Sequence, residues 1–223
     1  MELNKYIDHT NLKADAKRRD ILKLCNEAIE YNFASVCVHP YFVSYCKEIL
    51  ENTSINVCTV IGFPLGLNTT EVKVFEVEDA IKNGADEIDM VINVSALKDK
   101  KYDYLKKEIS RVLGVCEGRT LKVIIETCYL ENSEIIKATE ICNETFVNFI
   151  KTSTGFGTGG AKTDDIKVIN KVKSEILEIK ASGGIKTYND AISFIELGVT
   201  RLGTSNGVII MEGNHEDIWW IKI

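Results

Sequence analysis

Eight short apolar segments recur along the chain, and their spacing restricts the fold more than any other feature of the sequence. Most of them are rich in valine, isoleucine and threonine. Such runs are typical of strands that are buried on both faces of a parallel sheet. The segments read YIDHT, ASVCVH, NVCTVIGF, EIDMVINV, LKVIIET, VNFIKTS, LEIKASGG and TRLGTS, and they begin near residues 6, 34, 56, 87, 121, 147, 177 and 200.

The stretches between these segments carry the spacing of amphipathic helices. In residues 16–32 the predicted buried face consists of Ile21, Leu24, Cys25, Ala28 and Ile29. A similar pattern in residues 69–85 stops at Gly84, and glycine often ends helices. Strand and helix alternate along the whole chain, which indicates right-handed βαβ units and a parallel sheet.

Eight strands, each followed by a helical segment, predict a closed (β/α)8 TIM barrel of the α/β class. We expect a single domain over residues 1–223, because no linker rich in serine or proline divides the chain. An open, doubly wound sheet is the alternative. It fits less well, because no G-x-G-x-x-G motif follows the first apolar segment.

The composition predicts a cytoplasmic protein that binds neither nucleic acid nor membrane. The net charge is −6, and the lysines are scattered along the chain instead of forming a basic face. No apolar stretch approaches the ~20 residues of a membrane-spanning helix, and the first ten residues lack the pattern of a signal peptide. The seven cysteines form no C-x-x-C pair, so we expect buried free thiols.

Charged residues lie near the ends of several predicted strands, where the chemistry of barrels is found. Lys151 follows the apolar part of the sixth strand, Lys180 lies in the seventh and Asp89 in the fourth. Because side chains alternate along a strand, we expect these three to point into the barrel. A single strand-end lysine is usually a solvated rim residue, and the sequence leaves Lys122 between the rim and the interior.

Two adjacent lysines have a chemical consequence. Neighbouring ammonium groups repel each other, so one of them loses its proton more readily than an isolated lysine does. A neutral lysine is a nucleophile that condenses with a carbonyl group. The pair Lys151 and Lys180 therefore predicts an enzyme that forms a Schiff base.

Two glycine-containing loops, residues 182–184 and 203–207, follow the seventh and eighth predicted strands. In barrels these loops commonly form a phosphate site together with a short extra helix, for which residues 205–213 are a candidate. Exposed backbone N–H groups suit a phosphate dianion. A single glycine after a strand is often only a turn residue, but the two loops together predict a phosphorylated substrate.

These motifs together resemble those of the 2-deoxyribose-5-phosphate aldolase family. The resemblance runs from about residue 6 to about residue 205 and rests on YIDHTNLK, VCTVIGFPLG, ADEIDMVIN, LKVIIETCYL, FIKTSTG, IKASGGI and LGTS. It implies a class I aldolase on a TIM barrel, without a metal or other cofactor. The implied reaction is the reversible cleavage of 2-deoxy-D-ribose 5-phosphate to D-glyceraldehyde 3-phosphate and acetaldehyde, in the breakdown of deoxynucleosides.

The resemblance also implies roles for individual residues. It makes Lys151 the Schiff-base nucleophile, Lys180 the partner that favours the neutral form of that nucleophile, and Asp89 a group that moves protons with a bound water. The implied substrate pocket and phosphate site comprise Asp8, Thr10, Cys37, Lys122, Thr154, Gly155, Gly183, Gly184, Lys186, Gly203 and Ser205. Metal ligands are not implied.

Four features depart from the family pattern. His39 stands where an asparagine is expected, Asn206 where a serine is expected, and Lys162 where a threonine is expected. Some longer members end in a tyrosine that assists proton transfer, whereas this chain ends in HEDIWWIKI. None of these changes removes one of the three central catalytic candidates.

Three other functions fit parts of the sequence. A metal-dependent aldolase needs clustered ligands, but His9, His39 and His215 lie far apart in the chain. A barrel isomerase acting on a phosphorylated sugar could use Glu126 as its base, yet it leaves the two lysines without a role. A non-catalytic sensor of phosphorylated ligands stays open. As partners we expect a small phosphosugar and further copies of the chain, in a homodimer or larger homo-oligomer.

Overall fold

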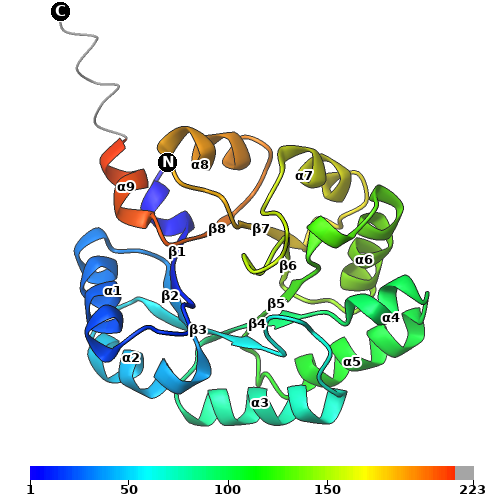
Figure 1. The fold of residues 1–223 in the computed structure, drawn as a ribbon, viewed down its shortest axis with the longest axis horizontal. Helices are drawn as coiled ribbons and strands as arrows, with labels where there is room; N and C mark the ends of the chain where they lie inside the picture. Colours follow the sequence, from blue (N-terminus) through cyan, green and yellow to red (C-terminus); the bar gives the residue numbers. More distant parts are fainter. Residues whose placement is uncertain (214–223) are drawn as a thin grey trace, which may run out of the picture.

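The computed structural model describes residues 1–213, which fold into a closed barrel of eight parallel strands (Figure 1). The strands pair in sequence order, and β8 closes the barrel against β1. Their bounds are β1 Ile7–Asn11, β2 Ser35–Val38, β3 Asn56–Ile61, β4 Glu87–Val91, β5 Thr120–Ile124, β6 Phe149–Lys151, β7 Glu178–Ser182 and β8 Arg201–Thr204. The predicted TIM barrel is confirmed, and the open doubly wound sheet is wrong.

Helices surround the barrel and connect its strands (Figure 1). Their bounds are α1 Arg18–Tyr31, α2 Val43–Leu50, α3 Thr70–Lys82, α4 Val94–Lys98, α5 Tyr102–Gly114, α6 Asn132–Glu144, α7 Thr163–Asn170, α8 Tyr188–Ile195 and α9 Gly207–Gly213. Three 3-10 helices are η1 Leu3–Tyr6, η2 Pro40–Phe42 and η3 Thr127–Tyr129. Within residues 1–213, none of the helices has the length and apolar character needed to span a membrane.

The sequence of α1 explains how a helix covers the barrel. Its buried side chains are spaced by three and four residues, and they are Ile21, Leu24, Cys25 and Ala28. The prediction that Ile29 belongs to this face is wrong, because Ile29 lies at the margin of the stripe and is 42% exposed. The helix ends at Asn32, whose left-handed φ of 53° stops the helical hydrogen-bond pattern.

The two faces of the strands bury different kinds of residue. Outward side chains of the strands pack against the helices in a continuous apolar core, which includes Ile88, Met90, Val123, Ile150 and Ile179. Inside the barrel a much smaller apolar cluster consists of Leu12, Cys37, Cys58 and Val60, with Phe63 packed against it. The rest of the interior holds charged side chains, which places reactive groups inside the barrel.

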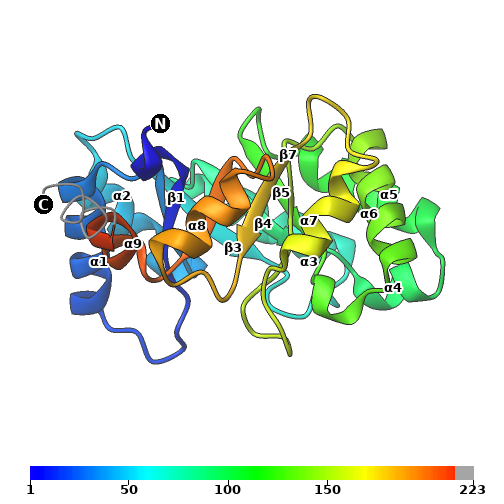
Figure 2. The ribbon, with the colours of Figure 1, turned by 90° about the horizontal axis from the view of Figure 1, so that it is seen from above.

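The C-terminal ends of the strands meet at one end of the barrel. Figure 2 shows the barrel from the side, with the loop after β1 in blue and the loop after β6 in yellow-green extending from the same edge. Both loops contribute to one polar cavity that reaches the interior. Parallel strands therefore bring segments that are distant in sequence to a common site.

Candidate active site

Lys151, Lys180 and Asp89 meet inside the barrel, as strand alternation predicts. Lys151 ends β6, and Lys180 is its register neighbour on β7. The Oδ2 atom of Asp89 accepts hydrogen bonds from Lys151 Nζ at 2.7 Å and from Lys180 Nζ at 2.8 Å. Three strands thus bring two ammonium groups to a single carboxylate oxygen.

Lys122 is also an interior residue. Its side chain is fully buried, and its Nζ atom donates to Asp89 Oδ1 at 3.0 Å and pairs with Glu87. A position at the solvated rim, which the sequence left open, is therefore wrong for Lys122. Asp89 receives hydrogen bonds from all three lysines.

Arg201 on β8 also joins the network, although no sequence motif marks it as a site residue. Its Nε atom donates to Asp8 Oδ1 at 2.7 Å, and its Nη2 atom donates to Glu87 Oε2 at 2.8 Å. Asp8 also forms an ion pair with Lys180. Barrel closure brings β8 beside β1, so Arg201 links the two ends of the sheet through these carboxylates.

The interior charges balance without the amine of Lys151. In their usual ionisation states the other charged groups are three carboxylates and three cations, namely Asp8, Glu87, Asp89, Lys122, Lys180 and Arg201. A protonated Lys151 is the surplus cation among these residues. Of Lys122, Lys151 and Lys180, Lys151 is the one that lines the polar cavity.

The network fixes the ionisation of its members. Burial alone would raise the pKa of Asp89, but the three lysine ammonium groups around it outweigh burial and hold this pKa well below its usual value. Burial alone would lower the pKa of Lys180, but Asp8 and Asp89 outweigh burial and raise this pKa well above its usual value. Near neutral pH, Asp89 is therefore ionised and Lys180 is protonated.

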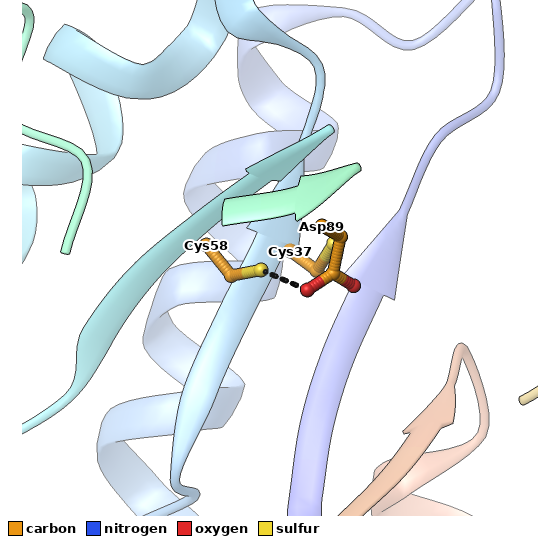
Figure 3. A group of neighbouring side chains, drawn as sticks. All are labelled: Cys37, Cys58 and Asp89. Carbon is orange, nitrogen blue, oxygen red and sulfur yellow. Dashed lines mark hydrogen bonds between the residues drawn. The ribbon is translucent and has the colours of Figure 1, made fainter. Parts of the chain in front are cut away.

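Cys37, Cys58 and Asp89 converge in the barrel interior from β2, β3 and β4 (Figure 3). Their potential ligand atoms lie within 4.8 Å of one another, and Cys58 Sγ donates to Asp89 Oδ1 at 3.2 Å. The same carboxylate already receives three ammonium groups, which repel a further cation. This group therefore fits a metal ion poorly, and we assign Cys37 and Cys58 to the wall of the interior. All seven cysteines are free thiols.

A polar cavity of about 1000 Å³ opens above Lys151. Of the residues expected at the site, it is lined by Thr10, Lys151, Thr154, Gly155, Gly183, Gly184, Lys186, Gly203 and Ser205. The remaining ones, which are Asp8, Cys37, Asp89, Lys122 and Lys180, are fully buried in the barrel interior. The structure therefore brings together every residue expected at the site, in two layers.

A second cavity of about 210 Å³ lies beside the first and is mainly apolar. The loops after β3, β4, β5 and β6 form its walls, with Leu65, Leu67 and Tyr129 among the lining residues. Thr154 and Phe156 line both cavities. The Phe156 ring packs edge-on against Phe63 at 5.3 Å between centroids, so this aromatic pair stands at the boundary between a polar and an apolar half.

The departures from the family pattern lie at the edges of the site. His39 Nε2 contacts the Leu12 carbonyl oxygen at 3.0 Å, while Lys162 is exposed before α7 and Asn206 lines the polar cavity. His9 points to the α1 side of β1, where it contacts Glu27 at 2.7 Å. His9 and His39 thus have separate partners. The expected replacement of a C-terminal tyrosine concerns residues outside the described range, as does His215.

A closed (β/α)8 barrel with interior lysines below a polar cavity belongs to the class of barrel enzymes that carry their chemistry at the C-terminal ends of the strands. Residues 3–211 match the family model of the DeoC/LacD family aldolases. The chain therefore belongs to the DeoC/LacD aldolase family. It is an enzyme of the lyase type.

Individual relatives agree with this assignment. The chain is 54% identical over 217 residues to the deoxyribose-phosphate aldolase of Thermococcus gammatolerans, and the match covers 96% of both chains. It is 40% identical to a solved structure named QR15, an aldolase, with a TM-score of 0.93 and 99% of both chains covered. The deoxyribose phosphate aldolase of Aeropyrum pernix, described as tetrameric, is 28% identical with a TM-score of 0.88, covering 95% of this chain and 90% of that one.

Proposed function

We propose that this enzyme reversibly cleaves 2-deoxy-D-ribose 5-phosphate to D-glyceraldehyde 3-phosphate and acetaldehyde through a Schiff base on Lys151. The observation that carries the proposal is the position of Lys151, which lines the polar cavity while its Nζ atom contacts Asp89 Oδ2 at 2.7 Å. The names of the relatives at about 50% identity support this choice of substrate.

The neutral amine of Lys151 attacks the C1 carbonyl of the open-chain sugar, and water leaves as the iminium forms. A proton then leaves the C3 hydroxyl, and the C2–C3 bond breaks. Its electron pair moves onto the iminium and gives an enamine, while D-glyceraldehyde 3-phosphate departs. Protonation of the enamine at C2 and hydrolysis of the resulting iminium release acetaldehyde and restore the amine.

Lys180 and Asp89 support these steps in different ways. Lys180 stays cationic between Asp8 and Asp89, so it opposes a second positive charge on Lys151 and favours the nucleophilic amine. Asp89 orients both lysines through its Oδ2 atom. Because its pKa lies well below the usual value, Asp89 holds a proton only transiently and passes it to a bound water.

The covalent intermediate gives a direct test of the proposal. Incubation with acetaldehyde and borohydride should add a two-carbon unit, and peptide mass spectrometry should locate it on Lys151. A Lys151→Met variant should remain unlabelled and inactive while it keeps its thermal unfolding midpoint. Labelling of Lys180 or Lys122 instead would refute the assignment. Turnover should also survive exhaustive chelation, whereas a loss restored by zinc or cobalt would favour a metal-dependent reaction.

The phosphate end of the substrate has a separate test. In this proposal backbone N–H groups of the loops at residues 183–184 and 203–205 hold the phosphate, with Lys186 adding charge. Gly184 has φ of 82°, and a side chain there would point into open space. Gly184→Glu should raise the KM for the phosphorylated sugar about tenfold or more by adding like charge. Turnover of unphosphorylated deoxyribose should change much less.

Gly198 supplies the matched control for Gly184. It has φ of 87° and equally open surroundings. It lies in the turn before β8, however, at the end of the barrel opposite to the proposed phosphate loops. Gly198→Glu therefore introduces the same backbone strain without approaching the phosphate. If both variants lose activity equally on both sugars, the effect of Gly184→Glu is on folding and the phosphate site is misplaced.

No observation favours the alternative functions. Glu126, the base that an isomerase would need, has its carboxylate turned to Thr154. A non-catalytic sensor would not bind acetaldehyde covalently, so the borohydride experiment distinguishes it. We also propose a homo-oligomer, because one relative is described as tetrameric. Cytoplasmic residence and independence from metal stay predictions.

A further inference from the structure

Glu126 has a backbone conformation that is uncommon for its residue type. It follows β5 with φ 54° and ψ 65°, in the left-handed region that favours glycine. The other non-glycine residues with such φ values in the described chain are exposed, and they are Asn32, Lys100, Glu117 and Phe146. Glu126 alone among them is buried, with 3% of its surface exposed. A strained, buried residue persists only where its surroundings hold it, which is common at functional sites.

Hydrogen bonds to Thr154 hold Glu126 in this conformation. The Thr154 N–H donates to the two carboxylate oxygens of Glu126 at 3.1 and 3.3 Å, and the Thr154 hydroxyl donates to Oε2. The hydroxyl oxygen of Thr154 in turn accepts a hydrogen bond from the Phe156 N–H at 3.0 Å. The carboxylate therefore orients three consecutive residues of the loop that follows Lys151.

The same loop is tied at two further points to η3, which follows β5. The Thr127 N–H donates to the Thr152 carbonyl oxygen at 2.9 Å. Gly157 packs so closely that an added Cβ would lie 2.7 Å from Cys128 Sγ. Since Thr154 and Phe156 line both cavities, the carboxylate of Glu126 supports the wall between the polar and the apolar half.

We propose that Glu126 is a positioning residue, which fixes the Thr154–Phe156 loop for the substrate by accepting both hydrogen bonds of Thr154. This role rests on the proposed function, because Thr154, Gly155 and Phe156 line the polar cavity in which the phosphorylated sugar is proposed to bind. Glu126 itself touches no reacting atom. Its loss affects substrate binding, while the chemistry at Lys151 remains.

Glu117 provides a matched control at the other end of β5. It is also a glutamate with left-handed φ, 51°, and it lies just before β5 instead of after it. Its side chain is 69% exposed and pairs with Arg119 at 2.9 Å. Substitutions of Glu117 therefore repeat the change in residue type and backbone freedom, without the contact to the active-site loop.

The experiment compares Glu126→Gln, Glu126→Gly, Glu117→Gln and Glu117→Gly. Glutamine keeps the size but removes the negative charge and one of the two acceptor oxygens, and glycine removes the whole side chain and also releases the backbone strain. Both Glu126 variants should raise the KM for 2-deoxyribose 5-phosphate about tenfold, the effect of losing a hydrogen bond to a charged group. Labelling of Lys151 by acetaldehyde and borohydride should stay within about twofold of wild type, as expected when binding is lost and chemistry kept.

Hydrogen exchange of residues 152–157 measures the local opening of the loop in the absence of substrate. The peptide should exchange faster in both Glu126 variants and at the wild-type rate in both Glu117 variants. Thr154→Val removes the hydroxyl contact from the other side and should also speed exchange of this peptide, which covers the case that a Glu126 variant does not fold. Exchange is the measurement used for this variant, because Thr154 itself lines the polar cavity. Wild-type KM and exchange in Glu126→Gly, which has no side chain to accept from Thr154, would overturn the proposal. If the wild-type enzyme itself does not cleave the sugar, the substrate is wrong, and the exchange rates still decide the role of Glu126.

Discussion

The inner and outer faces of the barrel strands carry opposite chemistry, although they alternate residue by residue. On β4, Ile88 and Met90 point into the apolar core, whereas Asp89 between them points at three ammonium groups. All three residues are fully buried. Apolar contact stabilises in proportion to the area removed from water, but a buried charge persists only with partners. Most of the stability therefore comes from the outer face, whereas the groups proposed to react lie on the inner face.

Lys180→Leu should have the largest effect on the inner face. It removes the charge that opposes protonation of Lys151, so kcat at pH 7 should fall about a hundredfold or more. As pH rises, Lys151 loses its proton without help, and kcat should recover in part. The pH profile of kcat measures both effects.

The same substitution should also lower the stability of the protein, although Lys180 lies on the inner face. Lys180 pairs with Asp8 as well as Asp89, and removing one partner of a buried pair costs about 3–5 kcal/mol. Lys180→Leu should therefore unfold at a lower temperature, and adding Asp8→Asn should restore part of this loss but not kcat. Wild-type kcat at pH 7 in a folded Lys180→Leu enzyme would exclude the proposed role, leaving Lys122 as the charged partner.

A second prediction compares neighbours on β4. Ile88→Ala should lower the free energy of unfolding by about 2–5 kcal/mol through the cavity it creates, with kcat near that of the wild type. Asp89→Asn should keep the side-chain volume but reduce kcat strongly, because a neutral amide cannot balance the lysines. Urea unfolding and turnover of both variants give the comparison. Equal loss of kcat in both would show that the two faces are not independent.

A smaller effect should appear in acid. The pKa of Asp89 and that of Glu87 lie below their usual values because nearby cations outweigh burial. Such groups contribute stability that is complete above the unfolded value of about 4 and is lost as pH falls below it. The free energy of unfolding should therefore fall below pH ~4 in wild type and less steeply in Asp89→Asn. Parallel curves would contradict this, whereas Ile88→Ala should shift the curve without changing its slope.

The barrel could be predicted because each apolar run in the sequence indicates a strand that is buried on both faces. Strand alternation also predicted the inward direction of Lys151, Lys180 and Asp89, since it is a local property of the backbone. The roles of these residues were predicted from the family resemblance, together with the repulsion between two adjacent ammonium groups. Local patterns thus determined which strand face each of these residues occupies.

Contacts between distant segments could not be predicted in this way. Arg201 reaches Asp8 only because β8 pairs with β1, and this closure has no local signal. Lys73 on α3 is fully buried and pairs with Glu108 on α5 at 2.8 Å, a contact between two helices that no local pattern marks. The left-handed backbone of Glu126 depends on Thr154, 28 residues away. Glu117 is also a glutamate with a left-handed backbone, so residue type alone does not distinguish the two positions.

If the proposed Schiff base forms on Lys151, the balance of charges around this residue also determines the proton stoichiometry of the reaction. With Lys151 as an amine the interior is electrically neutral, so each iminium formed takes up one proton from solution. Cleavage of the carbon–carbon bond gives a neutral enamine and returns that proton. Over one turnover the uptake and release cancel. The heat of imine formation therefore includes the ionisation enthalpy of whichever buffer supplies the proton, so calorimetry in two buffers counts the protons directly.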